Sequence, residues 1–148
     1  MSEFIKGDVI ILSIHDGSIY RPVACLTSNS LSQTRNIIES QTKCDPGVII
    51  KDAGSLSYEI AFEGRYIDTT SAGAQVTLAS HDWLKPNAME VLTGNIWRMS
   101  TGLTDTPFYY GDGIMSDLEL TADAGDELAN FSGTLAGSGS IVEIDPVV

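Results

Sequence analysis

The clearest hydrophobic pattern in the chain runs over residues 55–68, where apolar and polar side chains alternate. One face of this run carries Leu56, Tyr58, Ile60, Phe62 and Tyr66, and the other carries Ser57, Glu59, Ala61, Glu63 and Arg65. Successive side chains of a strand point to opposite faces of a sheet, so the alternation predicts a strand that is buried on one face and wet on the other. The run is far longer than an average strand of roughly 5–6 residues.

The segment before this strand, residues 36–54, is predicted to be a long projecting connection, or arm. Its turn is at Asp45-Pro46-Gly47, because Pro presets φ and Gly permits a positive φ. Its candidate contact residues are Lys43, Asp45, Pro46, Val48, Ile49, Ile50 and Lys51. Two interpretations stay open: a decorated surface loop, or an arm that docks on another subunit and so covers the apolar run 48–50.

The N-terminal part of the chain predicts a hairpin followed by a further strand. Residues 8–15 form a dense β-branched run, and Asp16-Gly17 is a strong hairpin turn signal. Residues 18–26 are the expected return strand, and Pro22 places that strand at a sheet edge or bulge because Pro cannot donate to the ladder. Residues 31–39 favour a strand that leads into the arm.

One short amphipathic helix is expected over residues 72–84. Ala72, Val76, Ala79 and Trp83 recur at helical spacing. Ser71 is a plausible N-cap, and Lys85-Pro86 is the expected end because a residue before Pro disfavours the α region. A strand over residues 75–78 is the competing interpretation.

The second half of the chain predicts further strands. Residues 95–99 form one strand, and an aromatic segment at 108–110 is expected to be broken by Gly111-Asp112-Gly113. In residues 114–122, Met115 is expected on the polar face with Asp117 and Glu119. Return strands follow at 127–136 and 141–144. About eight strands and one helix favour a single mainly β domain over residues 1–148, an antiparallel sandwich or barrel.

The charge distribution excludes one class of function. The net charge is −12, and all Lys and Arg residues precede residue 99. Such a surface repels a nucleic-acid backbone instead of binding it by charge neutralisation. No apolar run approaches the ~20 residues of a membrane span, and the N-terminus lacks a signal-peptide pattern, so synthesis in the cytoplasm and no membrane partner are expected.

A search for catalytic or metal-binding groups finds no constellation. Cys25, Cys44, His15 and His81 lack zinc-type spacing, and no G-x-S-x-G, P-loop or dinucleotide-binding motif is present. We therefore expect no enzyme activity, no metal and no cofactor. A β-rich, acidic chain with a long arm suggests an interaction protein.

Five segments spread over most of the chain are informative as a group. They are residues 23–39 (VACLTSNSLSQTRNIIE), 52–64 (DAGSLSYEIAFEG), 110–113, 131–135 and 137–139. In this order they resemble the phage major tail proteins, which form the tail tube of long-tailed bacteriophages. The resemblance implies a β-sandwich with a flanking helix and a long loop. It also implies hexameric rings, with sheets joined across subunits, that stack into a tube through which DNA leaves the capsid.

The same resemblance implies partners and a location. The chain would contact copies of itself and other tail proteins (tape measure, terminator and distal tail), and DNA would pass without specific binding. It would reside in the virion tail after assembly in the host cytoplasm. A ring of six would carry 6 × −12 = −72 formal charges, a field that keeps phosphate off the wall.

Alternation and the family picture together predict four acids that face the lumen: Glu59, Glu63, Asp117 and Glu119. The arm would bridge subunits or successive rings. Two alternatives remain: a related ring protein, such as a distal tail or injection-tube subunit, and a carbohydrate-binding module. The module would need an exposed aromatic platform, for which the candidates are Trp83, Trp97, Tyr109 and Tyr110.

Overall fold

The computed structural model describes residues 10–23, 26–41, 47–67, 78–100, 108–125 and 128–146. Its elements are β1 (Ile11–His15), β2 (Tyr20–Pro22), β3 (Leu26–Ser40), β4 (Ile50–Arg65), α1 (His81–Leu84), the π-helical turn η2 (Lys85–Met89), β5 (Asn95–Ser100), β6 (Tyr109–Thr121) and β7 (Asn130–Val142). The strands form one antiparallel sheet in the order β2-β1-β5-β6-β7-β4-β3. The prediction of a mainly β, antiparallel fold with one short helix is confirmed.

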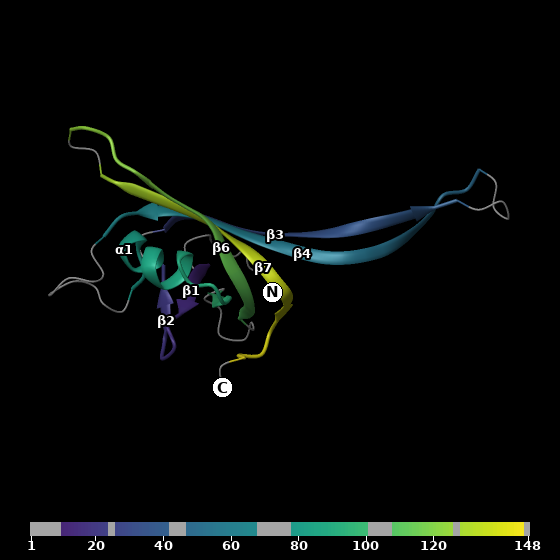
Figure 1. Ribbon diagram of the computed structural model, residues 1–148, viewed down its shortest axis with the longest axis horizontal. Coiled ribbons are helices and arrows are strands. Elements are labelled where there is room, and N and C mark those ends of the chain that lie inside the picture. Colours follow the sequence, from purple (N-terminus) through teal and green to yellow (C-terminus); the bar gives the residue numbers. More distant parts are fainter. Residues whose placement is uncertain are drawn as a thin grey trace, which may run out of the picture.

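The sheet curls around a single core, and a hairpin of β3 and β4 leaves that body (Figure 1). The side chain of Asn29 on edge strand β3 donates to the carbonyl of Ile10, next to β1, at 3.1 Å. The sheet therefore curls far enough to bring edge strand β3 close to the start of β1, which lies near the opposite edge. The short β2 lies at the other edge and ends at Pro22, as its missing donor predicts.

The predicted alternation of β4 holds where the strand crosses the core. Tyr58, Ile60 and Phe62 are buried, and they pack with Trp97 of β5 and Phe131 of β7. Their neighbours on the other face of β4 are exposed. Leu56 and Tyr66, predicted to share the buried face, are 44% and 37% exposed. Leu56 lies where β4 extends past the core, and Tyr66 follows the end of the strand at Arg65.

The predicted break at Gly111-Asp112-Gly113 is wrong, since β6 runs through all three residues. The glycines make room for the core instead of forming a turn. A Cβ at residue 111 would lie 2.6 Å from the Tyr58 hydroxyl, and one at residue 113 would lie 2.9 Å from Cγ of Leu135. The strand can pass this close to large side chains only without a side chain of its own.

A β-bulge in β6 places Met115 on the face opposite to the predicted one. The pairing of β6 with β7 shifts register between Met115 and Asp117, and the Met115 side chain is buried instead of lying on the polar face. An extra residue in one strand changes the phase of its alternation. Asp117 and Glu119 consequently stay exposed, while Leu118 is half-buried on the core side.

The helix is shorter and later than predicted. It begins at His81 after an N-cap at Ser80, and the helical backbone continues through Pro86 to Met89 as a π-helical turn. The α-helix itself ends at Leu84, as predicted, although Lys85 keeps helical backbone angles before the Pro. Ala79 instead forms a bridge with Val23. The first part of the predicted helix, residues 72–77, and the proposed cap Ser71 lie outside the described residues.

The predicted connection over residues 36–54 is largely strand. β3 continues to Ser40 and β4 starts at Ile50, and these two residues pair. Backbone hydrogen bonds between the two strands satisfy groups that a loop would leave to water. From here on, the arm means the exposed part of this hairpin, residues 32–41 and 47–57.

Candidate functional site

Four neighbouring strands present one continuous polar face, which we call the outer face. Directly opposite residues of an antiparallel pair lie on the same face of the sheet. Across β3, β4, β7 and β6, three rows of such partners are Ser28, Glu63, Ser132 and Glu119; Ser30, Ala61, Thr134 and Asp117; and Ser32, Glu59, Ala136 and Ile114. The four predicted acids therefore share one face, although they come from two strands that are not neighbours.

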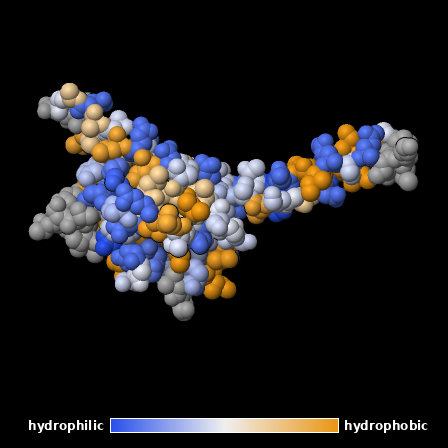
Figure 2. All heavy atoms as spheres, in the orientation of Figure 1, coloured by the Kyte–Doolittle hydropathy of each residue, from blue (hydrophilic) through white to orange (hydrophobic). Residues whose placement is uncertain are grey.

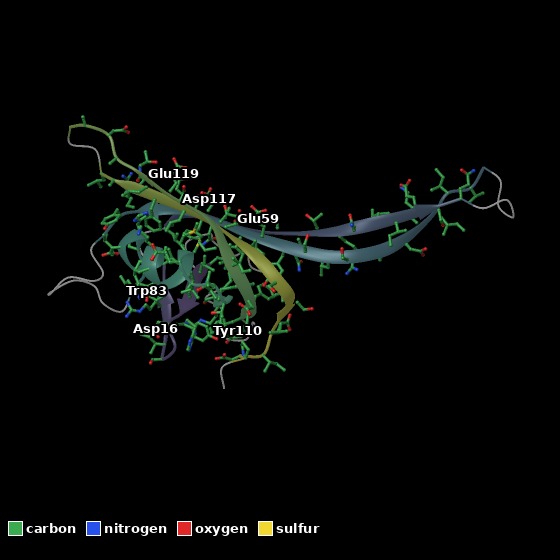
Figure 3. The ribbon with its side chains drawn as sticks, in the orientation of Figure 1. Asp16, Glu59, Trp83, Tyr110, Asp117 and Glu119 are labelled. Carbon is green, nitrogen blue, oxygen red and sulfur yellow. The ribbon has the colours of Figure 1, made fainter. Side chains whose placement is uncertain are left out.

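The outer face points away from the core. Glu59, Asp117 and Glu119 stand on one side of the sheet, and Trp83 lies on the other (Figure 3). All four acids are exposed. The remaining positions of the rows are hydroxyl-bearing or small, apart from Ile114, and a shallow hollow of about 290 Å³ lies between Ser30, Glu63 and Asp117. Arg65 is a cation at the end of this face, opposite Asn130.

Two edges of this four-stranded region lack a strand partner within the described residues. β3 is the last strand of the sheet. β6 pairs with β5 only over residues 109–113, so its second half, from Ile114 to Thr121, is paired on one side alone. Open edges recruit further strands unless they are covered. The region can therefore be extended by a strand at each side.

The arm is the second candidate surface. It projects far from the core, and hydrophobic side chains recur along it (Figures 1 and 2). Val48, Ile49 and Ile50, which the sequence singled out, are all exposed, and Lys51 pairs with Glu39 at 3.6 Å. The predicted arm residues Lys43, Asp45 and Pro46 lie outside the described residues.

No exposed aromatic platform is present among the candidates for glycan binding. Trp83, Trp97 and Tyr110 are buried, and Tyr109 is half-buried. The Trp97 indole donates to the Tyr58 hydroxyl at 3.1 Å, and this hydroxyl donates to the carbonyl of Asp112. These aromatic groups hold the core together and are not available for stacking on a sugar.

A compact ionic cluster lies at the first hairpin. Asp16 accepts from Arg21 Nε at 2.8 Å and from the backbone of Ser18 and Ile19. The Arg21 hydrogen bond, with help from the backbone, lowers the pKa of Asp16 to about 2. The guanidinium of Arg21 also lies 5.0 Å from the centre of the Trp83 ring. This cluster ties the hairpin to α1, which is a structural role.

The described residues offer no other chemistry of the kinds searched for. No group of three or more His, Cys, Asp or Glu side chains within them could hold a metal ion. No helix in the same part of the chain is long and apolar enough to cross a membrane.

Solved structures with the same fold come from particle tails, a tail tube and contractile injection systems. The chain superposes on the tail of an empty gene transfer agent particle solved with C6 symmetry (TM-score 0.69, 10% identity, 95% of this chain and 98% of that one). The tail tube of SPP1 gives 0.68 at 10% identity (91% and 76%). The sheath-tube complex of an extracellular contractile injection system, PVC, gives 0.60 at 15% (90% and 86%). At these identities the likeness shows the fold.

The family follows from the sequence itself. The model of the phage tail tube protein family matches residues 5–143, and the chain belongs to that family. A search of curated proteins finds no match. The role of the protein is thus structural, and the outer face and the arm are the surfaces to explain.

Proposed function

We propose that copies of this chain close into rings by joining their sheets, and that the outer face lines the lumen of the resulting tube. The observation that carries this proposal is the pair of open edges that flank the outer face. The free half of β6 in one copy can pair with β3 of the next copy. This contact is heterologous, so repeated rotation closes a ring in which neither side of the four-stranded region keeps an open edge.

The dimensions of such a ring suit the passage of DNA. Four strands per copy and six copies, the symmetry of the related gene transfer agent tail, give 24 strands. At about 4.8 Å between strands, the circumference is roughly 115 Å and the backbone diameter roughly 37 Å, before strand tilt widens it. A DNA duplex fits through such an opening.

The chemistry of the outer face suits a conduit that does not bind its cargo. Glu59, Glu63, Asp117 and Glu119 would place four carboxylates per copy in the lumen. Their field repels phosphate, and the hydroxyl groups between them keep the wall wetted. The proposed role is therefore a structural conduit for DNA ejection, without catalysis.

The arm would contact other copies of the chain, away from the core of the copy that carries it. It stands off the core and exposes apolar side chains, which need a partner. We place the assembly in the host cytoplasm and the product in the virion tail. The ends of the tube would meet other tail proteins, for which the tape measure, terminator and distal tail proteins are the family's candidates.

Negative-stain electron microscopy of the purified protein, at low and high concentration, tests the proposal. We expect rings with a central hole at low concentration and hollow tubes at high concentration. A variant that tests the edge pairing replaces Leu118 and Leu120 of β6 with Pro, which removes backbone hydrogen-bond donors from the free half of this strand. If this variant keeps its fold and still forms rings, the proposed edge pairing is wrong. Single rings that never stack would favour the distal-tail alternative.

A further inference from the structure

The arm contains a β-bulge that decides which of its side chains share a face. Arg35 pairs with Leu56, but Ile37 pairs with Ala53, so two residues of β4, Gly54 and Ser55, oppose Asn36 alone. Gly54 suits this place because a Cβ there would lie 2.8 Å from the carbonyl oxygen of Asn36. Beyond the bulge the alternation of β4 is inverted relative to its inner half.

The inversion distributes the apolar residues over both faces of the arm. β3 keeps its alternation, so Ile37 continues the core-side face together with Leu56, the partner of Arg35. Ile38 continues the outer face, and Ile50 joins it as the partner of Ser40. The ion pair between Glu39 and Lys51 fits this register, since those two residues face each other on the core side.

All four of these side chains are exposed in the single chain. Ile37 and Leu56 on the core-side face are 61% and 44% exposed, and Ile38 and Ile50 on the outer face are 56% and 40% exposed. Each pair exposes apolar surface that water disfavours. If the arm contacted a partner through one face only, the apolar pair on its other face would stay in water.

We propose that the arm of each copy lies in a slot between two other copies of this chain, one covering the Ile37–Leu56 face and one covering the Ile38–Ile50 face. This inference rests on the proposed function and adds the number of partners and the residues that meet each of them. The arm would then link three copies, which makes growth of the tube cooperative.

The charge of the arm favours other copies of the chain as its occupants. Its described charged residues are Arg35, Lys51, Glu39 and Asp52, two of each sign, so the arm is neutral in a chain of net charge −12. A ribbon without net charge that exposes apolar side chains can enter an acidic neighbour without charge repulsion. The length of the arm also suits this role. About 10 residues per strand beyond the core span roughly 33 Å, so the core of the same copy cannot cover the apolar side chains along the arm.

Two matched double variants of the full chain test the slot. I37T/L56T makes the core-side face polar, and I38T/I50T does the same to the outer face, while Thr keeps a high strand propensity. The control L92T/I144T changes two residues that are 98% and 81% exposed and lie away from the arm. The readout is the lowest protein concentration at which tubes sediment, and the melting temperature reports the fold of each variant.

We expect each arm variant to raise that concentration at least tenfold and the control to leave it unchanged, with the same melting temperature for all. If only one arm variant raises it, the arm rests on a single surface and the slot is wrong. If neither does, the arm carries no apolar contact and the slot is equally wrong. Failure of the unaltered protein to form tubes would instead overturn the proposed function.

Discussion

Gly137 of β7 packs directly against the ring of Tyr58, so that a Cβ at residue 137 would lie 2.4 Å from three ring atoms. Tyr58 is buried and has no room to retreat, because it also contacts Trp97 with ring centres 5.6 Å apart. We predict that Gly137→Ala destabilises the fold by about 1–3 kcal/mol, the usual effect of overpacking. Chemical denaturation monitored by tryptophan fluorescence measures the loss.

The exposed neighbour Ser140, on the same strand, gives the matched control for this prediction. Ser140→Ala changes the side chain without entering the core and is expected to stay within about 0.5 kcal/mol of the unaltered protein. Equal stabilities for the two variants would show that the close approach of residue 137 to the ring is relieved at little cost.

A second prediction concerns the hydroxyl of Tyr58. It accepts from the Trp97 indole and donates to the carbonyl of Asp112, so it satisfies two groups near the core at once. Tyr58→Phe keeps the ring but leaves both groups without this partner, which should lower the free energy of unfolding by about 1–3 kcal/mol. Unchanged stability in urea denaturation would mean that water or a neighbour replaces the hydroxyl.

The Asp16–Arg21 pair predicts a specific dependence on pH. The folded state holds the pKa of Asp16 at about 2, below the ordinary value of 3.8. A lowered pKa contributes stability above the ordinary value, and this contribution is lost as the pH falls from 3.8 towards 2. Asp16→Asn retains an oxygen for the backbone donors and removes the charge.

We therefore expect the unaltered protein to melt higher than Asp16→Asn at pH 7, and the difference to shrink as the pH falls through this range. Melting curves of both proteins over a pH series provide the test. A difference that stays constant down to pH 2 would assign the effect to lost turn hydrogen bonds and not to the ion pair.

The acids of the outer face should matter for DNA passage and not for assembly. Replacement of Glu59, Glu63, Asp117 and Glu119 with Lys should leave tubes intact but slow or trap DNA in the lumen, since Lys binds phosphate. The control places Lys at Glu90 and Glu143, which are exposed away from the three rows of the outer face. Normal ejection of DNA by virions with the fourfold variant would mean that this face does not line the lumen.

The arm should be dispensable for folding and required for tube growth. Thr34 and Ser57 lie directly opposite each other, so an Asn-Gly turn can replace residues 35–56 and close the hairpin there. We expect a folded chain with an unchanged melting temperature and no tubes by electron microscopy. The simpler deletion of residues 42–51 is expected to act in the same way. Normal tubes from both variants would reduce the arm to a surface decoration.

The sequence predicted the features that depend on local alternation. The period of β4, the hairpin at Asp16-Gly17 and the edge position of Pro22 follow from side-chain chemistry at those residues, and the structure confirms them. The grouping of Glu59 and Glu63 on one exposed face followed for the same reason. Placing Asp117 and Glu119 in the same rows required strand order, which alternation alone does not contain.

The errors arise where tertiary contacts set the backbone. Gly111 and Gly113 look like a turn until the positions of Tyr58 and Leu135 are known. The bulges at Met115 and Gly54 are visible only as shifts of register between paired strands, so no single-strand pattern reveals them. The extension of strand into residues 36–54 likewise depends on pairing between two segments with mixed polarity.

The Tyr20 hydroxyl of β2 donates to Asp145 at 2.7 Å and so ties the C-terminal segment to the first hairpin. The C-terminal end lies below the body of the molecule in Figure 1. The guanidinium of Arg98 also packs over the ring of Tyr20, 4.6 Å from the ring centre. A peptide or enzyme fused after this anchor would leave the subunit on the side opposite the outer face. If the outer face lines the lumen as proposed, assembled tubes would then display the fused cargo on their exterior at regular intervals, and the bore would stay clear.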